Sequence, residues 1–181
     1  MKRALIVATV ILFVSHLYAG QQKTPDLRQQ ASFCEDGPDE TVLKPIPLPS
    51  EVVSALMNTA EANAARESAE NKGRNLNPAT LFKGTTVHLA KSVDVFYLVM
   101  GSFPMSGADN TWFWIVRSSG NGATILLWAG ANCVDISRKG TLGYKDIVTT
   151  WSSARYAKTT IYKYSGRSYK VWRTKSRPVS W

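Results

Sequence analysis

The chain has 181 residues and a formal net charge of +9 at pH 7, with 22 lysines and arginines against 13 acidic residues. This length is enough for one domain with a substantial core. Beyond the first twenty residues no stretch is apolar enough to cross a bilayer as a helix.

The first twenty residues have the pattern of a secretory signal peptide. Two basic residues precede an apolar run at positions 4–14, and small residues follow it. The run is too short to span a bilayer, although an uncleaved membrane anchor is the alternative. We expect cleavage after Ala19 or Gly20. The sequence therefore predicts an exported, soluble protein, periplasmic or extracellular, without a transmembrane segment after cleavage.

Residues 21–49 are polar and contain five prolines, which predicts an extended arm without a helix or strand of its own. Cys34 lies in this arm, and the second cysteine is Cys133. An even number of cysteines in an exported protein predicts one disulfide. It would close a loop of about a hundred residues, worth about 4–5 kcal/mol in the chain-entropy model. Two separate buried thiols are the alternative.

Residues 50–181 are predicted to form a single globular domain that begins with one helix over residues 50–72. Ser50 is the expected N-cap and Gly73 the expected stop. The inner face is expected to contain Val52, Leu56 and Ala60, joined by Val53, Met57 and Ala64. A short turn of helix is expected to follow at Asn77-Pro78.

The pattern changes to strands from residue 85 to residue 173, with turn residues about every ten positions. No strand–helix alternation is present, which argues against a parallel α/β sheet. We therefore predict a mainly β fold: an antiparallel sheet, sandwich or small barrel of about eight strands with one N-terminal helix. The expected strands are 86–90, 93–100, 111–117, 123–128, 132–136, 145–151, 159–164 and 167–173.

The last two strands are predicted to form a hairpin with a two-residue turn at Ser165-Gly166, which pairs Tyr164 with Arg167. Strand alternation then assigns each side chain to one of two faces. The face expected to be core contains Thr160, Tyr162, Tyr164, Tyr169 and Val171. The face expected to be wetter contains Ile161, Lys163, Lys170 and Trp172.

Positive charge is concentrated at the C-terminal end. Residues 136–181 contain eleven lysines and arginines and a single acidic residue, Asp146. Such a lobe favours an anionic surface or polymer as partner, although charged strand edges that prevent aggregation are the alternative. Trp and Tyr rings beside cations also stack on sugars or bases. We predict a candidate binding surface at Lys163, Lys170 and Trp172.

Two short motifs carry a family resemblance. The first is Gly143-Tyr144-Lys145-Asp146-Ile147, and the second is Tyr162-Lys163-Tyr164-Ser165-Gly166 followed by Tyr169. Together they resemble a G-x-x-D-[IL] … Y-x-[FY]-x-G-x-x-Y segment of many exported bacterial β-proteins, and they are loosely similar to one blade of FG-GAP-type propellers. The resemblance covers roughly residues 95–173.

FG-GAP blades usually carry an Asp-rich calcium loop, which this chain lacks, and the chain is too short for a full propeller. The resemblance therefore implies no metal site and no activity. Instead, Asp146, Gly143 and Gly166 are predicted to be structural turn residues, with the Asp146 carboxylate accepting hydrogen bonds from turn amides.

Nothing in the sequence selects a catalytic site. His88 is the only histidine after residue 20, and it is expected on the solvated or edge face of a strand, which argues against a Ser-His-Asp triad. The acidic residues Asp94, Asp109, Asp135 and Asp146 of the β region are scattered. We predict no catalytic residue, no cofactor, no metal and no sequence-specific nucleic-acid partner.

The favoured function is a non-catalytic binding or envelope-interaction module. A secreted hydrolase with a carboxylate-based site is one alternative, and an inhibitor or partner of another secreted protein is a second. The oligomeric state is left open by the sequence.

Overall fold

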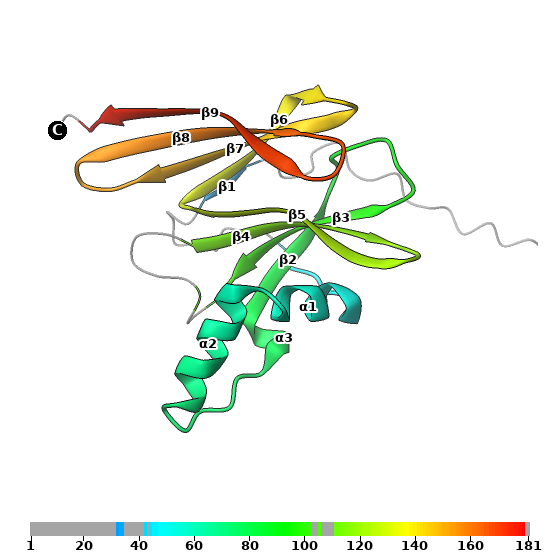
Figure 1. The fold of residues 1–181 in the computed structure, drawn as a ribbon, viewed down its shortest axis with the longest axis vertical. Coiled ribbons are helices and arrows are strands. Elements are labelled where there is room, and N and C mark those ends of the chain that lie inside the picture. The colour runs from blue at the N-terminus through cyan, green and yellow to red at the C-terminus, as the bar shows by residue number, and fades with distance from the viewer. Residues whose placement is uncertain (1–31, 35–41, 43, 103–104, 106–110, 180–181) are drawn as a thin grey trace, which may run out of the picture.

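The computed structural model describes residues 32–34, 42, 44–102, 105 and 111–179. The predicted signal peptide, much of the proline-rich arm and Asp109 lie outside the described residues. The described residues form two stacked antiparallel sheets, with helices on the outer side of one of them (Figure 1). The predicted mainly β, antiparallel fold is confirmed, and it is a sandwich of two open sheets within the described part of the chain rather than a closed barrel.

The larger sheet has five strands in the order β1-β6-β7-β8-β9. These strands are β1 (Ser32–Cys34), β6 (Cys133–Thr141), β7 (Tyr144–Ser152), β8 (Tyr156–Tyr164) and β9 (Tyr169–Pro178). The smaller sheet has four strands in chain order: β2 (Phe82–Val87), β3 (Val95–Gly101), β4 (Thr111–Ser119) and β5 (Gly122–Ala131). The β region therefore extends at both ends beyond the predicted residues 85–173.

Both faces of the four-stranded sheet are buried, which explains why β3 and residues 112–116 of β4 are apolar without alternation. Phe113 and Ile115 face the five-stranded sheet and contribute to the core between the sheets. Trp114, next to them in β4, is fully buried in a second core that includes Val52 and Leu56 of the helical layer. An antiparallel sheet with one solvated face would alternate apolar and polar residues, whereas a central layer cannot.

The helical segment differs from the single helix predicted for residues 50–72. It consists of α1 (Ser50–Met57) and α2 (Ala60–Glu70), and a short α3 (Pro78–Leu81) follows. The break occurs because Thr59 caps α2: its hydroxyl accepts from Ala62 N at 3.4 Å and donates to Leu56 O at 2.7 Å. A threonine side chain competes with the helical backbone for these groups.

The break also changes which alanines are buried. Ala62, Ala65 and Ala69 of α2 are buried, whereas Ala60 and Ala64 are exposed, so their predicted place on the inner face is wrong. Pro49, rather than the predicted Ser50, occupies the N-cap position of α1. Gly73 follows α2 with a φ of +64°, as suits a glycine just beyond a helix end.

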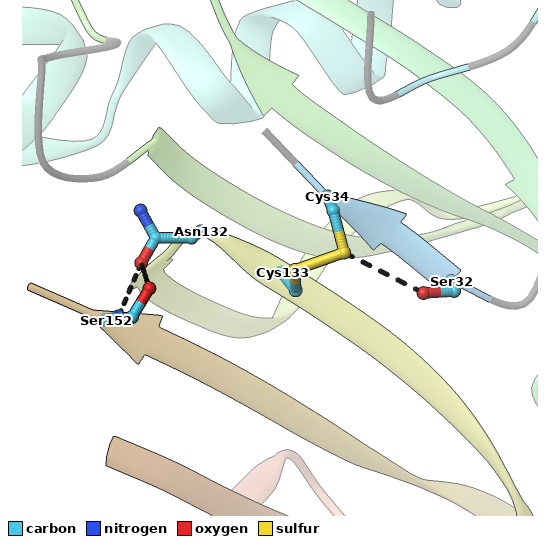
Figure 2. Close-up of a disulfide and its surroundings, with 5 residues drawn as sticks. All are labelled: Ser32, Cys34, Asn132, Cys133 and Ser152. Atoms are coloured by element: carbon cyan, nitrogen blue, oxygen red, sulfur yellow. Dashed lines mark hydrogen bonds between the residues drawn. A yellow bond between two sulfur atoms is a disulfide. The ribbon is translucent and has the colours of Figure 1, made fainter. Parts of the chain in front are cut away.

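The proline-rich arm contributes a strand that the sequence pattern did not predict. β1 pairs with β6, and the side chain of Phe33 at its centre is fully buried between the sheets. Cys34 lies opposite Cys133 in this pairing, and the predicted disulfide between them is present (Figure 2). A single buried aromatic residue and one covalent bond therefore hold this part of the arm on the sandwich.

The chain passes from one sheet to the other at Asn132, between β5 and β6. The buried Asn132 side chain accepts from Ser152 N at 2.6 Å and from Ser152 Oγ at 3.4 Å, next to the disulfide (Figure 2). These bonds fix the corner of the sandwich against the end of β7. Among the described residues, no helix is both long enough and apolar enough to span a membrane.

Candidate anionic-ligand surface

The β8–β9 hairpin carries the predicted binding residues, but its turn is longer than predicted. Tyr164 pairs with Tyr169, and a four-residue loop closes with a hydrogen bond of 2.9 Å from Ser165 N to Ser168 O. Gly166 lies in this loop with a φ of +92°, a conformation that favours glycine. The error shifts the pairing by two residues, and an even shift leaves every side chain on its predicted face.

Beneath this hairpin, three tyrosines form the contact between the two sequence motifs. The rings of Tyr144 and Tyr164 stack with centroids 3.8 Å apart, and Tyr169 meets Tyr164 edge-on at 5.6 Å. The Tyr169 hydroxyl donates to Lys145 O at 2.8 Å, and the Tyr164 hydroxyl donates to Gly166 O at 3.0 Å. The motif tyrosines therefore join the β6–β7 and β8–β9 hairpins.

The face of the hairpin that was predicted to be core is only partly buried. Thr160, Tyr164 and Tyr169 are buried, and Tyr162 is half-buried. Val171 is 61% exposed, so its predicted place in the core is wrong. The reason is that the four-stranded sheet does not cover β9, whose residues after Tyr169 are all exposed.

Replacing Tyr169 with phenylalanine tests the tyrosine contact through its dependence on pH. Burial, followed by the nearby Asp146 carboxylate, raises the pKa of Tyr169 well above its ordinary value. In the unfolded chain this hydroxyl ionises near pH 10, whereas in the folded protein it stays neutral, so its stabilisation is complete below pH 10 and is lost above it. We expect Tyr169→Phe to cost about 1 kcal/mol at neutral pH.

This cost should shrink as the pH rises above about 10, because phenylalanine has no proton to lose. Urea unfolding at a series of pH values measures it, with Tyr156→Phe as the control for an exposed tyrosine. A cost that stays constant up to about pH 11 would show that Tyr169 ionises in the folded protein as easily as in the unfolded chain.

The structure brings the three predicted surface residues together. Lys163 lies directly opposite Lys170 in the β8–β9 pairing, and its Nζ is 4.0 Å from the centroid of the Trp172 ring. The Trp172 side chain is 57% exposed. Like charges on directly opposed residues repel one another, so a cation–π contact with Trp172 partly offsets the repulsion.

A β-bulge at Trp172 adds three further cations to this surface. Tyr162 pairs with Val171 and Ile161 with Arg173, so Trp172 is an extra residue in β9. Strict alternation after Lys170 would place Arg173 on the inner face, which is turned toward the four-stranded sheet. The extra residue reverses the alternation beyond it.

A contact on the inner face shows which side chains of β9 point inward beyond the bulge. The hydroxyls of Thr160 and Thr174 lie 3.3 Å apart there. Arg173 and every second residue after it therefore point to the outer face. We call the resulting cluster the basic face. It consists of Lys163, Lys170, Trp172, Arg173, Lys175 and Arg177.

Sequence reasoning found half of these residues. The sequence shows that cations alternate over residues 173–177. It does not show that they share a face with Trp172, because nothing in the sequence marks the bulge.

The basic face has no acidic partner among the described residues. In the described part of the chain, ion pairs join Arg66 to Glu70 and Arg117 to Asp94, each at 4.0 Å, and neither pair involves β8 or β9. The one acidic residue of the C-terminal lobe, Asp146, is buried. The cations of β9 therefore keep their charge available to a ligand.

Asp146 lies next to the β6–β7 turn, where Leu142 and Gly143 both have positive φ. Its carboxylate accepts from the Thr141 hydroxyl at 2.8 Å, so the partner is a hydroxyl rather than the turn amides that we expected. This contact ties one strand of the hairpin to the other and leaves Asp146 inside the fold.

Among the residues that the structure describes, the other groups considered for catalysis or metal binding are not gathered into a site. His88 is exposed, and Asp94 is paired with Arg117. Within the described ranges, no three His, Cys, Asp or Glu residues lie close enough to hold a metal ion.

Comparison with known proteins identifies no relative: no family model, no curated protein and no solved structure matches the chain. The resemblance of the two motifs to exported bacterial β-proteins stays a prediction.

Proposed function

We propose that the protein is an exported, non-catalytic module that binds an extended polyanion through the basic face. The observation that supports this proposal is the bulge at Trp172, which gathers five cations and one exposed tryptophan on one side of a two-stranded ribbon. Residues two apart on a strand lie about 7 Å from each other. Alternate cations along β9 therefore form a row that suits a regularly charged ligand.

The alternative, that these charges only protect an edge strand from pairing with other chains, does not explain why they share one face. Lysines and arginines on an edge strand block pairing with other chains whichever face they occupy. Protection alone would not require Arg173, Lys175 and Arg177 to share a face with Lys163 and Trp172.

Export is supported by the Cys34–Cys133 disulfide, because such bonds persist mainly in oxidising compartments. A polyanion in such a compartment would be a membrane surface of anionic lipids or a charged polymer. Both present the same chemistry, a dense array of phosphate, sulfate or carboxylate groups.

The test is binding to heparin and to phosphatidylcholine vesicles with and without phosphatidylglycerol. We expect binding to heparin or to the anionic vesicles, and none to the neutral vesicles. If about four cations displace counterions, raising salt from about 50 to about 200 mM should weaken binding roughly 100-fold. Heparin-only binding would identify a polymer, and vesicle-only binding a lipid surface. Binding to neither, or binding that salt does not weaken, would contradict the proposal.

A further inference from the structure

A cleft of about 280 Å³ opens on the inner face of the five-stranded sheet, on the opposite side from the basic face. It lies where β7 and β8 pass the edge strand β5 of the smaller sheet, close to the Asn132 corner. It is lined by Gly130, Thr149, Trp151, Lys158, Thr160 and Tyr162.

The floor of this cleft is formed by Thr149 and Thr160, and Thr174 continues their row onto a third strand. Thr149 pairs with Thr160, and Thr160 pairs with Thr174. One step along β7 from Thr149, at Ile147, the inner face is fully buried and apolar, as a sandwich core requires. The change from aliphatic to hydroxyl side chains coincides with the point at which the cleft begins.

Thr149 and Thr160 are too deeply placed to be ordinary solvated residues at a sheet end. Thr149 is 5% and Thr160 is 6% exposed. The Thr160 hydroxyl has the Thr174 hydroxyl as its partner, whereas that of Thr149 makes no hydrogen bond to any described residue. The Thr149 hydroxyl is not one of the buried polar atoms without a partner, so it is open to the cleft, where a ligand hydroxyl can replace the water that binds it.

The walls supply two aromatic rings and one charge. Tyr162 lies on one side of the threonine row, two residues along β8 from Thr160, and the opposed pair Trp151 and Lys158 lies on the other side. Lys158 is the one charged residue in the lining, and no carboxylate opposes it. Small-molecule sites combine apolar surfaces with a few polar groups that fix orientation, and 280 Å³ is close to the lower limit of their usual range, about 300 Å³.

We infer that this cleft binds a single hydroxylated ring that carries an anionic group, such as a uronic acid or a sugar phosphate. The rings of Trp151 and Tyr162 contact the apolar faces of the sugar. The Thr149 hydroxyl binds a ring hydroxyl, and Lys158 pairs with the carboxylate or phosphate. The site shares no residue with the basic face and does not depend on the proposed function.

The experiment is a titration of the protein with glucuronate, glucose 6-phosphate and glucose, followed by two-dimensional NMR of the backbone amides. We expect a Kd of about 1 mM for at least one of the anionic sugars, so titration to about 10 mM should approach saturation. The affected amides should lie in β7 and β8 near Thr149, Trp151 and Lys158. Saturation by glucuronate alone would identify a carboxylate ligand, and by glucose 6-phosphate alone a phosphate ligand.

Two variants test the roles assigned to the lining. Lys158→Gln should weaken binding of the anionic sugar at least tenfold, and Thr149→Val, which keeps the side-chain shape, should weaken it several-fold. The triple variant Arg173→Gln/Lys175→Gln/Arg177→Gln should bind the sugar as the natural protein does. No saturation with either anionic sugar, equal affinity for glucose, or loss of sugar binding in the triple variant would overturn the inference.

Discussion

Replacing Arg173, Lys175 and Arg177 together with glutamine should weaken binding to the polyanion about 100-fold. A cation next to an anionic surface contributes about 1 kcal/mol, so three of them contribute about 3 kcal/mol. All three are exposed, so the fold should be unaffected. The measurement is a heparin or anionic-vesicle titration at low salt, whichever ligand the natural protein binds, and the dependence of affinity on salt should become shallower.

The matched control removes the same charge elsewhere. Lys72, Arg74 and Lys91 are exposed residues outside the five-stranded sheet. Their replacement with glutamine lowers the net charge by the same amount and should change affinity only slightly. Equal losses in the two triple variants would mean that net charge alone drives binding, and the basic face would have no special role.

Removing the disulfide should have the largest effect on stability. Cys34→Ala/Cys133→Ala reopens a loop with a sequence separation of 99 residues, for which the chain-entropy model gives about 4–5 kcal/mol. A domain is stable by only about 5–15 kcal/mol, so a large part of the total is lost. Urea unfolding followed by tryptophan fluorescence measures the change, and reduction of the natural protein should reproduce it.

The disulfide and the burial of Phe33 act together, because both hold β1 on β6. Phe33→Ala with the disulfide intact should cost about 3–5 kcal/mol, as for other large residues removed from a core. In the double cysteine variant the same substitution should cost much less if β1 has already detached. An unchanged urea midpoint after reduction would show that the arm stays in place without the bond.

The fold class could be predicted from the sequence because strand-length apolar runs separated by turn residues dominate residues 85–173. The helix break could not be predicted, since Thr59 is compatible with a helix interior as well as with an N-cap. β1 was missed because its three residues are too few to show alternation, and Phe33 is the one buried residue among them. The helix break depends on which of these roles Thr59 takes, whereas β1 depends on contacts with residues distant in sequence.

The candidate surface was predicted in part for a similar reason. Alternation correctly placed Lys163, Lys170 and Trp172 on one face, because the error in the turn was an even number of residues. Arg173 and the cations after it were missed because a bulge changes alternation by one residue. The cleft lined by Thr149 and Thr160 could not be predicted from the sequence, since threonine is common in strands whether or not it lines a site.

The bulge at Trp172 also makes this surface unusually sensitive to chain length. Deleting one residue from β9 before Arg173 would move Arg173, Lys175 and Arg177 from one side of the sheet to the other, next to Lys158, with the number of charges unchanged. A single-codon deletion or insertion could therefore exchange a protein with a charged outer face for one with a charged cleft. Conversely, a protein of the same composition but without the extra residue should differ in what it binds.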